Sequence, residues 1–397
     1  MEKKILLVDN NNFLDFPPGG TLSFDKQLLK AIPPERVALV GTTRENIKIG
    51  AWTTLTIEGR EYEFFPIARV SWSHKKPFLP RQLTATAALL FYLRRIRHKH
   101  AQWVFTQTPH FLFALRCYPW DSLCFYFAGV GNRVATSRYR YLRFLGQPYE
   151  QALLRTLRDK TDVILAAADD NAIQDLIRRG NGVLPDGCIR SFPTRFDSRI
   201  FHPLNKSRCR EALGLSPDKT ILVSVGRLCW IKGWDLLLDM MREKGDRDFV
   251  LVFVGDGEDR EHIEGIGADL LVREEIRITG FLPPGMVAQY LGASDLVLVA
   301  SYQEGWSTAM VEALACGKPL VSTPVSGAAD LIQEERNGYI LYDRDPAQLL
   351  ALIDRALGLE DPGATSTAIA RKYALDHLWD DLQMEWPQIR QKHNLIQ

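Results

Sequence analysis

The sequence predicts an α/β fold of two Rossmann-like, doubly wound parallel-sheet domains. Short strand-like runs alternate with helical stretches along both halves of the chain, which is the pattern of repeated strand–helix units. The runs at residues 221–225 and 296–300 are apolar on both faces, as expected of parallel strands that helices cover on each side. A chain of 397 residues is also long enough for two domains of about 100–200 residues, each with its own core.

The expected elements follow this alternation in order. The first half is predicted to hold strands at residues 4–9, 36–40, 103–107, 123–127 and 163–166, helices at 22–31, 81–100, 139–160 and 169–179, and extended segments at 52–57 and 62–65. The second half is predicted to hold strands at residues 221–225, 250–254, 276–278, 296–300 and 320–322, and helices at 234–241, 259–271, 284–291, 308–316 and 346–357.

A linker near residue 200 is expected to separate the two domains. Residues 191–203 contain two prolines and show no hydrophobic period, so they predict an N-terminal domain of residues 1–200 and a C-terminal domain of residues 201–375. The tail carries Leu378, Leu382, Trp386 and Ile389 at helical spacing, a stripe that must pack against another element. We assign residues 376–397 to the N-terminal domain, as a C-terminal helix that crosses back.

The composition is that of a globular protein without a metal or disulfide framework. Hydrophobic residues make up 46% of the chain and charged residues 24%, which excludes disordered and collagen-like classes. The six cysteines lie far apart, without a C-x-x-C motif or a Cys/His cluster, so no metal site is expected. The start has only four consecutive apolar residues, and the run at 83–93 is too short to cross a bilayer. A cytoplasmic location is therefore expected.

The charge is divided unequally along the chain. The total is +1, but residues 1–200 carry 29 basic and 18 acidic side chains, whereas the remainder carries 20 and 30. Residues 64–160 alone hold 16 basic and three acidic side chains, many of the basic ones beside aromatics. This asymmetry indicates that the first half meets an anionic surface. No nucleic-acid-binding motif accompanies the charge, so no nucleic-acid partner is expected.

The loop after the strand at 221–225 carries two cations, Arg227 and Lys232, each beside a glycine. In open α/β sheets, ligands bind outside the carboxyl ends of the strands. An arginine offers a forked set of donors and a lysine a point charge, a pair suited to a diphosphate. Two solvated surface charges are the alternative, and the position at a strand end favours the anion site.

The helix at residues 308–316 provides a second candidate anion site. Ser307 or Thr308 is expected to cap it, and its first turn offers N–H groups and the positive end of the helix dipole. Glu312 is the helix's one charged residue and must find hydrogen-bond donors or shift its pKa. A ribose diol would satisfy it, and an Arg or backbone partner is the alternative. Glu304 precedes the cap and can point into the same cleft.

Other nucleotide and metal motifs are excluded. Gly129-x-Gly131 lacks the third glycine of the dinucleotide fingerprint, and no G-x-x-x-x-G-K-[ST] sequence occurs. The Asp246/Asp248 and Asp343/Asp345 pairs lie beside the ends of helices, and we interpret them as solvated surface rather than as metal ligands.

These residues, in this order, resemble the retaining nucleotide-sugar glycosyltransferases of GT-B fold, specifically family 4. Further matches extend across most of the chain, at residues 18–20, 196–197, 201–203, 254–258, 279–283, 326–327 and 337–338. The resemblance implies that the two domains face each other across a cleft, with the donor bound by the C-terminal domain and the acceptor by the N-terminal domain.

The resemblance also implies a role for each matched residue. Arg227 and Lys232 would hold the donor diphosphate and stabilise the leaving nucleotide, so that no metal or other cofactor is needed. Glu304 would contact the donor sugar near the reacting carbon, completing a catalytic set of Glu304, Arg227 and Lys232. Glu312 would bind the ribose. The remaining donor-binding residues would be Gly305, Trp306 and Ser307 through backbone N–H groups, Gly280, Phe281 and Leu282 along the nucleobase, and Gly19 and Gly20 beside the diphosphate.

One departure from the family pattern concerns the acceptor side. Many relatives carry a histidine just after the strand that here ends at Phe127, whereas this chain continues Ala128-Gly-Val-Gly-Asn132. His110, Asn132 and Arg133 are the candidates for its place. For His110, a purely structural role is the alternative.

The expected function is transfer of a hexose-type sugar from a nucleoside diphosphate sugar to an acceptor hydroxyl, with retention. The expected partners are the nucleotide sugar, a lipid-linked or surface-polysaccharide glycan, and an anionic membrane at the inner face of the cytoplasmic membrane, on which the basic N-terminal domain would dock peripherally. Two alternatives remain: a nucleotide-sugar 2-epimerase of the same fold, and a non-catalytic nucleotide-sugar-binding protein.

Overall fold

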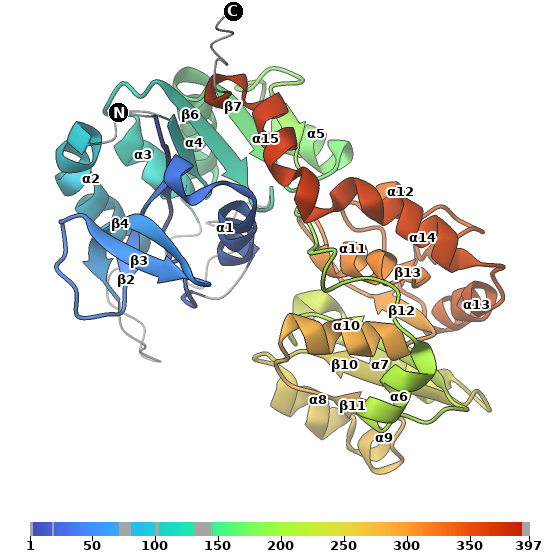
Figure 1. Cartoon of the computed structure of the whole chain (residues 1–397). Helices are drawn as coiled ribbons and strands as arrows, with labels where there is room; N and C mark the ends of the chain where they lie inside the picture. Colours follow the sequence, from blue (N-terminus) through green and yellow to red (C-terminus); the bar gives the residue numbers. More distant parts are fainter. Residues whose placement is uncertain are drawn as a thin grey trace, which may run out of the picture. The chain divides into compact units, whose positions relative to one another are not determined.

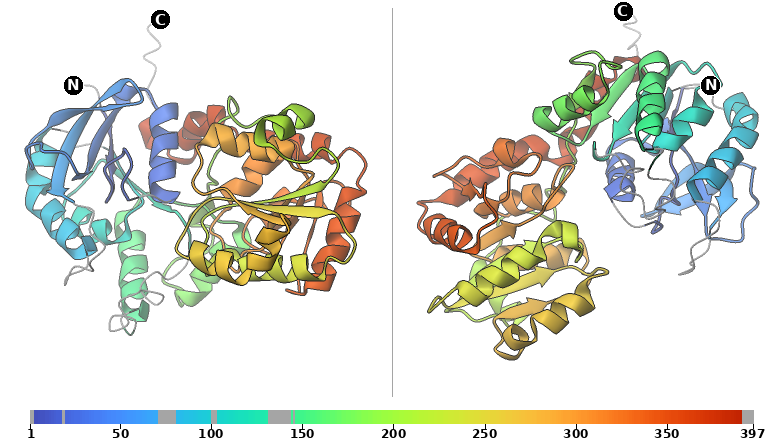
Figure 2. Two further views of the ribbon diagram at one scale, coloured as in Figure 1. Left: turned by 90° about the horizontal axis from the view of Figure 1, so that it is seen from below. Right: turned by 180° about the vertical axis from the view of Figure 1, so that it is seen from behind.

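The chain forms two compact units (Figures 1 and 2). The computed structural model describes residues 3–17, 20–70, 81–99, 103–130, 144 and 146–390. One unit holds the chain up to Pro193 and again from Leu378, and the other holds Thr194–His377. The division at Pro193 falls inside the segment 191–203 that the sequence predicts as a linker. Across these described ranges, no helix is long and apolar enough to cross a membrane.

The N-terminal unit is built on one mainly parallel sheet. Its eight described strands run in the order β3-β4-β2-β1-β5-β6-β7-β8, and only the β3–β4 pair is antiparallel. The strands are β1 Ile5–Val8, β2 Val37–Thr43, β3 Thr53–Ile57, β4 Arg60–Arg69, β5 Trp103–Thr106, β6 Ser122–Phe127, β7 Val163–Ala166 and β8 Ile189–Ser191. The α-helices are α1 Gly20–Ala31, α2 Arg81–Lys99, α3 Leu112–Leu115, α4 Gly146–Lys160, α5 Asp170–Arg179 and α15 Leu378–Glu385.

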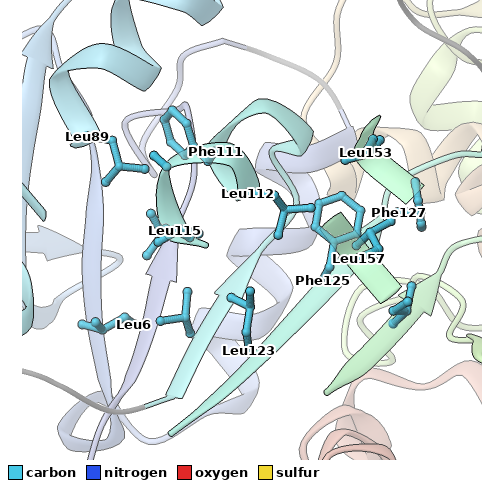
Figure 3. Packing of buried hydrophobic residues seen from close by; sticks show 14 of the residues in the cluster. Leu6, Leu89, Phe111, Leu112, Leu115, Leu123, Phe125, Phe127, Leu153 and Leu157 are labelled. Atoms are coloured by element: carbon cyan, nitrogen blue, oxygen red, sulfur yellow. The ribbon is translucent and has the colours of Figure 1, made fainter. Parts of the chain in front are cut away.

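The core of this unit lies between the sheet and the helices α2, α3 and α4 (Figure 3). Leu89 of α2, Leu112 of α3 and Leu157 of α4 are fully buried in one cluster with the strand residues Leu6 and Phe125. Complete burial of such a side chain contributes about 1.5–3 kcal/mol each. Every residue of the central strands β1, β5, β6 and β7 is buried, so these strands are covered on both faces, as the sequence predicts.

The C-terminal segment completes the N-terminal unit. Trp386 is fully buried, and its Nε1 donates a hydrogen bond to Ser122 Oγ on β6 at 2.8 Å. The Arg36 guanidinium donates to the carbonyl oxygen of Ile389 at 2.8 Å. The four apolar residues of the predicted tail stripe are 0–1% exposed. Figure 1 shows α15, which carries the first two of them, against the N-terminal unit.

The C-terminal unit is built on a second, entirely parallel sheet. Its six described strands run in the order β11-β10-β9-β12-β13-β14. The strands are β9 Thr220–Val225, β10 Phe249–Val254, β11 Ile276–Ile278, β12 Leu296–Val299, β13 Leu320–Ser322 and β14 Gly338–Ile340. The α-helices are α6 Lys206–Leu213, α7 Trp234–Glu243, α8 Arg260–Ile266, α9 Ala268–Val272, α10 Pro284–Ala293, α11 Thr308–Ala315, α12 Ala328–Leu331, α13 Pro346–Leu357 and α14 Pro362–Ala370.

The predicted fold class, two parallel-sheet domains with helices on both faces, is confirmed. The structure contains elements that the sequence did not predict. These are the three-residue strands β8 and β14 and the four-residue helices α3 and α12, which are too brief to show a period, and the longer helices α6 and α14. The helix expected at residues 259–271 is instead two helices, because the chain breaks at Gly267 between α8 and α9.

Candidate functional site

A pocket lies at the carboxyl ends of β9 and β12 in the C-terminal unit. From β9 the chain continues to β10 and β11 on one side of the sheet, and later returns to β12, β13 and β14 on the other. The order therefore reverses between β9 and β12, which is where open α/β sheets bind their ligands. Ser224 of β9 and residues of the loops that follow the two strands line the pocket: Gly226, Arg227, Leu228, Lys232, Ala300, Ser301, Glu304 and Ser307.

The two loops are held against each other by backbone contacts. The N–H of Tyr302 donates to the carbonyl oxygen of Ile231 at 2.8 Å. Gly233 has a φ of +68°, and a Cβ there would lie 1.8 Å from the carbonyl oxygen of Ala300. Only glycine fits this position, because both the left-handed backbone and the close approach exclude a side chain. The packing fixes where Lys232, the preceding residue, presents its ammonium group.

Lys232 and Glu304 form an ion pair across these loops. Lys232 Nζ lies 2.6 Å from Glu304 Oε1, and Ser301 Oγ donates to the same oxygen at 2.7 Å. The Glu304 side chain is 11% exposed and that of Lys232 is 31% exposed. Among the described residues, no group donates a hydrogen bond to Glu304 Oε2. The pair thus presents one free carboxylate oxygen and the remaining ammonium N–H groups to a ligand.

Arg227 supplies a second cation on the same loop. Its Nε lies 3.7 Å from Glu258 Oε2, and the two side chains are 66% and 61% exposed. An exposed pair at this distance is weak, because water screens it. The guanidinium is therefore available to an anion in the pocket, as the diphosphate hypothesis requires.

The N-terminus of α11 faces the same pocket through Ser307. Ser307 is the N-cap residue, but its side chain makes no capping hydrogen bond. Thr308 Oγ1 instead lies 2.9 Å from Thr194 Oγ1. The expectation that one of these hydroxyls caps the helix is wrong, and the first-turn N–H groups are left without a side-chain cap. An uncapped first turn beside two cations favours an anionic ligand.

The ring of Trp306 is packed inside the protein and is not available to a ligand. The side chain is 7% exposed and packs against Gly327, where a Cβ would lie 2.9 Å from the indole. The indole also contacts the ring of Tyr373 at 5.4 Å between centroids. Trp306 therefore anchors the loop with its ring, and the ligand-binding role expected for its backbone and that of Gly305 stays a prediction.

Glu312 lies on α11, one turn below the pocket. Burial raises the pKa of its carboxyl group from 4.5 to about 8. Within the described ranges, neither an Arg nor a backbone N–H pairs with this carboxylate. The structural alternative raised from the sequence thus finds no partner here, and the raised pKa is the response of the carboxyl group to its burial. The ribose-binding role stays a prediction.

The residues expected along the nucleobase form a turn after β11. Gly280 has a φ of +75° and pairs with Gly255 in an isolated bridge. The next side chain, Phe281, is 84% exposed. Leu282 follows and is half-buried. The turn thus presents an unpartnered aromatic ring.

The remaining candidates belong to the N-terminal unit or lie outside the described residues. Gly20 is exposed at the first position of α1, and a Cβ there would meet no atom within 4 Å. His110 lies in the turn after β5, packed against Phe111. Gly19, Asn132 and Arg133 lie outside the described residues, so the acceptor-side hypotheses that rest on them stay predictions.

Ser301 is the site residue that sequence reasoning missed. Its hydroxyl fixes the Glu304 carboxylate, as described above. A polar residue directly after an apolar strand was the available signal, because such positions line the carboxyl edge of a parallel sheet. In the part of the chain that the structure describes, no group of three His, Cys, Asp or Glu residues is placed to hold a metal ion.

Comparison with known proteins finds a family model that matches this unit. Residues 205–373, which include the whole pocket from Ser224 to Ser307, match the family described as Glycosyl transferases group 1. A D-inositol 3-phosphate glycosyltransferase of Acidothermus cellulolyticus is 30% identical over 213 residues, 50% of this chain and 47% of that protein. The chain spans about half the length of the curated relatives that it matches.

Solved structures of similar fold cover nearly all of the chain. A sucrose-phosphate synthase of Thermosynechococcus elongatus matches with a TM-score of 0.76 at 17% identity, over 98% of this chain and 99% of that one. Anabaena HepE, solved in complex with UDP-glucose, matches with a TM-score of 0.70 at 15% identity, over 97% and 100%. The chain resembles a GT-B glycosyltransferase of family 4. The resemblance inferred from the sequence is thereby confirmed, and so is the fold.

The close approach at Gly233 generates a testable prediction. Replacing Gly233 with Ala is expected to destabilise the C-terminal unit by at least about 2 kcal/mol more than replacing Gly245 with Ala. Gly245 has a similar φ of +61°, but a Cβ there meets nothing within 4 Å. The pair therefore separates the clash with Ala300 from backbone strain. Urea denaturation of both variants measures the difference, and equal destabilisation would contradict the packing described.

The unpaired Glu312 predicts a pH-dependent stability. Its folded-state pKa of about 8 exceeds the ordinary value of 4.5, so its stabilisation is complete below about pH 4.5 and is lost as the pH rises through about 8. The free energy of unfolding should therefore fall as the pH rises from 5 to 9. Glu312→Gln is expected to reduce this fall by about 1–3 kcal/mol. Denaturation between pH 5 and pH 9 measures it, with the exposed Glu335→Gln as the control. Identical slopes in wild type and Glu312→Gln would refute it.

Proposed function

We propose that this chain is a retaining glycosyltransferase that moves a hexose-type sugar from a nucleoside diphosphate sugar to an acceptor hydroxyl. The observation that carries the proposal is the pocket at the β9–β12 reversal. It combines Lys232 and Arg227 with the uncapped start of α11, next to the Glu304 carboxylate. Three positive groups around one small volume suit a diphosphate, and a carboxylate beside them suits sugar hydroxyls.

The proposed chemistry rests on stabilising the leaving group. The bond between the anomeric carbon and the phosphate oxygen breaks, and negative charge develops on the departing diphosphate. Lys232, Arg227 and the first turn of α11 offset that charge, and no cofactor is needed for it. Glu304 uses its free Oε2 to hold a hydroxyl of the donor sugar.

The groups that line the pocket support the proposed stereochemistry. Glu304 Oε1 accepts from Lys232 and Ser301, and the proposal uses the free Oε2 to hold a hydroxyl of the donor sugar, so it gives this carboxylate no role as a nucleophile. We infer attack by the acceptor oxygen on the same face from which the diphosphate leaves. The acceptor's proton passes to the departing phosphate oxygen, and the new glycosidic bond forms with retention.

The rest of the donor is assigned to neighbouring positions. Glu312 accepts hydrogen bonds from the ribose, since it has no other described partner. Gly280, Phe281 and Leu282 lie along the nucleobase, with the exposed Phe281 ring available for stacking. Anabaena HepE, a structural neighbour, was solved with UDP and with UDP-glucose, which supports a nucleotide sugar as the ligand class.

The N-terminal unit is assigned to the acceptor, a lipid-linked or surface-polysaccharide glycan. Gly20 is exposed at the start of α1 and has no packing reason to be glycine, which favours a role beside the diphosphate. Gly19 shares this proposed role. His110, Asn132 and Arg133 are the acceptor-side candidates.

The test of this function is donor turnover in matched lysine variants. A panel of nucleotide sugars first identifies the donor that binds. Lys232→Ala is then expected to lower kcat by about 10²–10³-fold, because it removes a cation from the leaving group. Lys219→Ala, in the same unit, removes a lysine that pairs only weakly with Asp248 at 3.4 Å and is expected to leave turnover unchanged.

Two outcomes would overturn the proposal. Equal turnover in Lys232→Ala and wild type would refute the site. Formation of a C2 epimer from UDP-N-acetylglucosamine alone, without an acceptor, would show the epimerase instead.

We further propose that α2 docks the N-terminal unit on an anionic membrane. The helix buries Ala85, Leu89, Leu93 and Ile96 in the core, yet its outer surface exposes Leu83, Leu90 and Phe91, the last at 76%. Arg94 and Arg95 follow on the same exposed surface. An apolar stripe beside basic residues is the composition of a helix that lies in a lipid interface.

Vesicle flotation tests this docking surface. Replacing Leu90 and Phe91 together with Ser is expected to weaken binding to phosphatidylglycerol vesicles by about tenfold or more, because both side chains lose burial in lipid. Met384→Ser, which removes a 63% exposed apolar residue from α15 of the same unit, is the control. High salt should also weaken binding. Equal binding of wild type and the double variant would contradict the proposal.

A further inference from the structure

A buried cluster of polar side chains lies at the carboxyl end of β1 in the N-terminal unit. Asp9 follows β1 directly and is 1% exposed, and Asp25 projects from α1 and is fully buried. Gln107 donates to both carboxyl groups, through its N–H to Asp9 Oδ1 and through Nε2 to Asp25 Oδ1, and the charge of Asp9 acts on the pKa of Asp25. Two carboxyl groups at this depth are costly unless protons or donors compensate them.

The donors around the pair are divided unequally between its oxygens. Asp9 Oδ1 accepts from the N–H of Gln107 at 2.8 Å and from Thr108 Oγ1 at 2.8 Å, with Thr106 Oγ1 at 3.4 Å. Asp9 Oδ2 is buried and accepts from no donor in the described part of the chain. An oxygen without a donor, beside a second carboxyl group, is where a shared proton belongs.

The charges around the pair leave one proton to be shared. Burial raises the pKa of both carboxyl groups, and the charge of Asp9 raises that of Asp25 further. The other groups that act on them are the neutral Asn11, Thr106, Gln107 and Thr108. No described Lys, Arg or His neutralises either acid. Like charges in one buried site cannot both ionise near neutral pH, so one acid keeps its proton.

The pair also fixes the loop that leads from β1 to α1. Asn11 Nδ2 donates to Asp25 Oδ2 at 2.6 Å, and Asn11 Oδ1 accepts from the N–H of Phe13 at 2.9 Å. Gln107 Nε2 donates to Asp25 Oδ1 at 2.7 Å and to the carbonyl oxygen of Thr21, in the first turn of α1, at 3.1 Å. Through these hydrogen bonds, Asp25 links the loop, the start of α1 and the end of β5.

We propose that Asp9 and Asp25 are positioning residues that share one proton and, as a singly charged pair, hold the loop after β1 and the start of α1 in the arrangement that binds the donor. This inference rests on the proposed function, which places Gly20 beside the donor diphosphate. Loss of the shared proton puts two negative charges in one buried site. Their repulsion displaces Asn11 and Gln107 and with them the start of α1.

Asp9→Asn removes the shared proton but keeps the hydrogen bonds that Asp9 makes. Its side-chain oxygen accepts the three donors that Asp9 Oδ1 accepts, and its amide donates permanently to Asp25, so the cluster keeps one charge and no proton to lose. The matched control is Asp162→Asn. Asp162 also accepts from a backbone N–H and a hydroxyl, those of Leu123 and Ser122, but at the opposite end of the strands.

Infrared spectroscopy and kinetics test the two halves of the proposal separately. Wild type at neutral pH should show, besides the band of the protonated Glu312 that all three proteins share, a second C=O stretching band of a protonated carboxylic acid that Asp9→Asn lacks and Asp162→Asn keeps. As the pH rises above neutral, the donor KM of wild type and Asp162→Asn should rise by about tenfold relative to Asp9→Asn. All three proteins keep Glu312, so its titration cancels from the comparison.

The outcomes distinguish this inference from the proposed function. A second band that Asp9→Asn keeps would refute the shared proton. A KM that rises equally in all three proteins would refute the positioning role. If no donor is turned over by any of them, the proposed function fails, while the infrared comparison still decides whether the pair shares a proton.

Discussion

The ion pair between Lys232 and Glu304 is the interaction on which the site depends. The two residues come from loops 72 positions apart, yet their charged atoms lie 2.6 Å from each other. At an effective dielectric of about 20, charges near this separation attract by several kcal/mol, and removal of one leaves the other partly buried and uncompensated. The pair therefore sets the position of both the cation that we propose for a diphosphate and the carboxylate that we propose for a sugar. The contact of Gly233 with Ala300, where no side chain fits, brings the two loops close enough for it to form.

This arrangement follows from the way that a parallel sheet is built. Parallel strands bring their carboxyl ends to one edge, so residues that follow β9 and β12 become neighbours although the sequence separates them. The helix after β12 then adds its uncapped first turn to the same place. In the N-terminal unit, the same geometry gathers Asp9 after β1 and Gln107 after β5 at one edge, with Asp25 joining from α1. Both units use the edge of the sheet to concentrate polar groups that the apolar strands cannot hold.

The fold and the cationic half of the site were accessible from the sequence because each rests on a local pattern. Alternating apolar runs predict the two sheets, and Arg227, Lys232 and Glu304 stand directly after predicted strands. What the sequence could not supply are distances between loops. Ser301 binds Glu304 only because the loop turns back between the two residues. No hydrophobic pattern in the sequence predicts that turn. The failure of Ser307 to cap α11 likewise depends on packing, as does the absence of a described partner for Glu312. The Asp9–Asp25 pair joins residues 16 positions apart whose burial is set by the whole unit.

Hydrogen–deuterium exchange with a saturating nucleoside diphosphate tests most directly whether the pocket at the β9–β12 reversal binds the diphosphate of the donor. The account predicts slower amide exchange at residues 226–233 and 301–312, because the ligand engages Lys232 and occupies the free N–H groups at the start of α11. Exchange in the strands β9 and β12, already bonded within the sheet, should stay unchanged. Unchanged exchange in both loops at saturation, with protection elsewhere in the chain, would contradict the account.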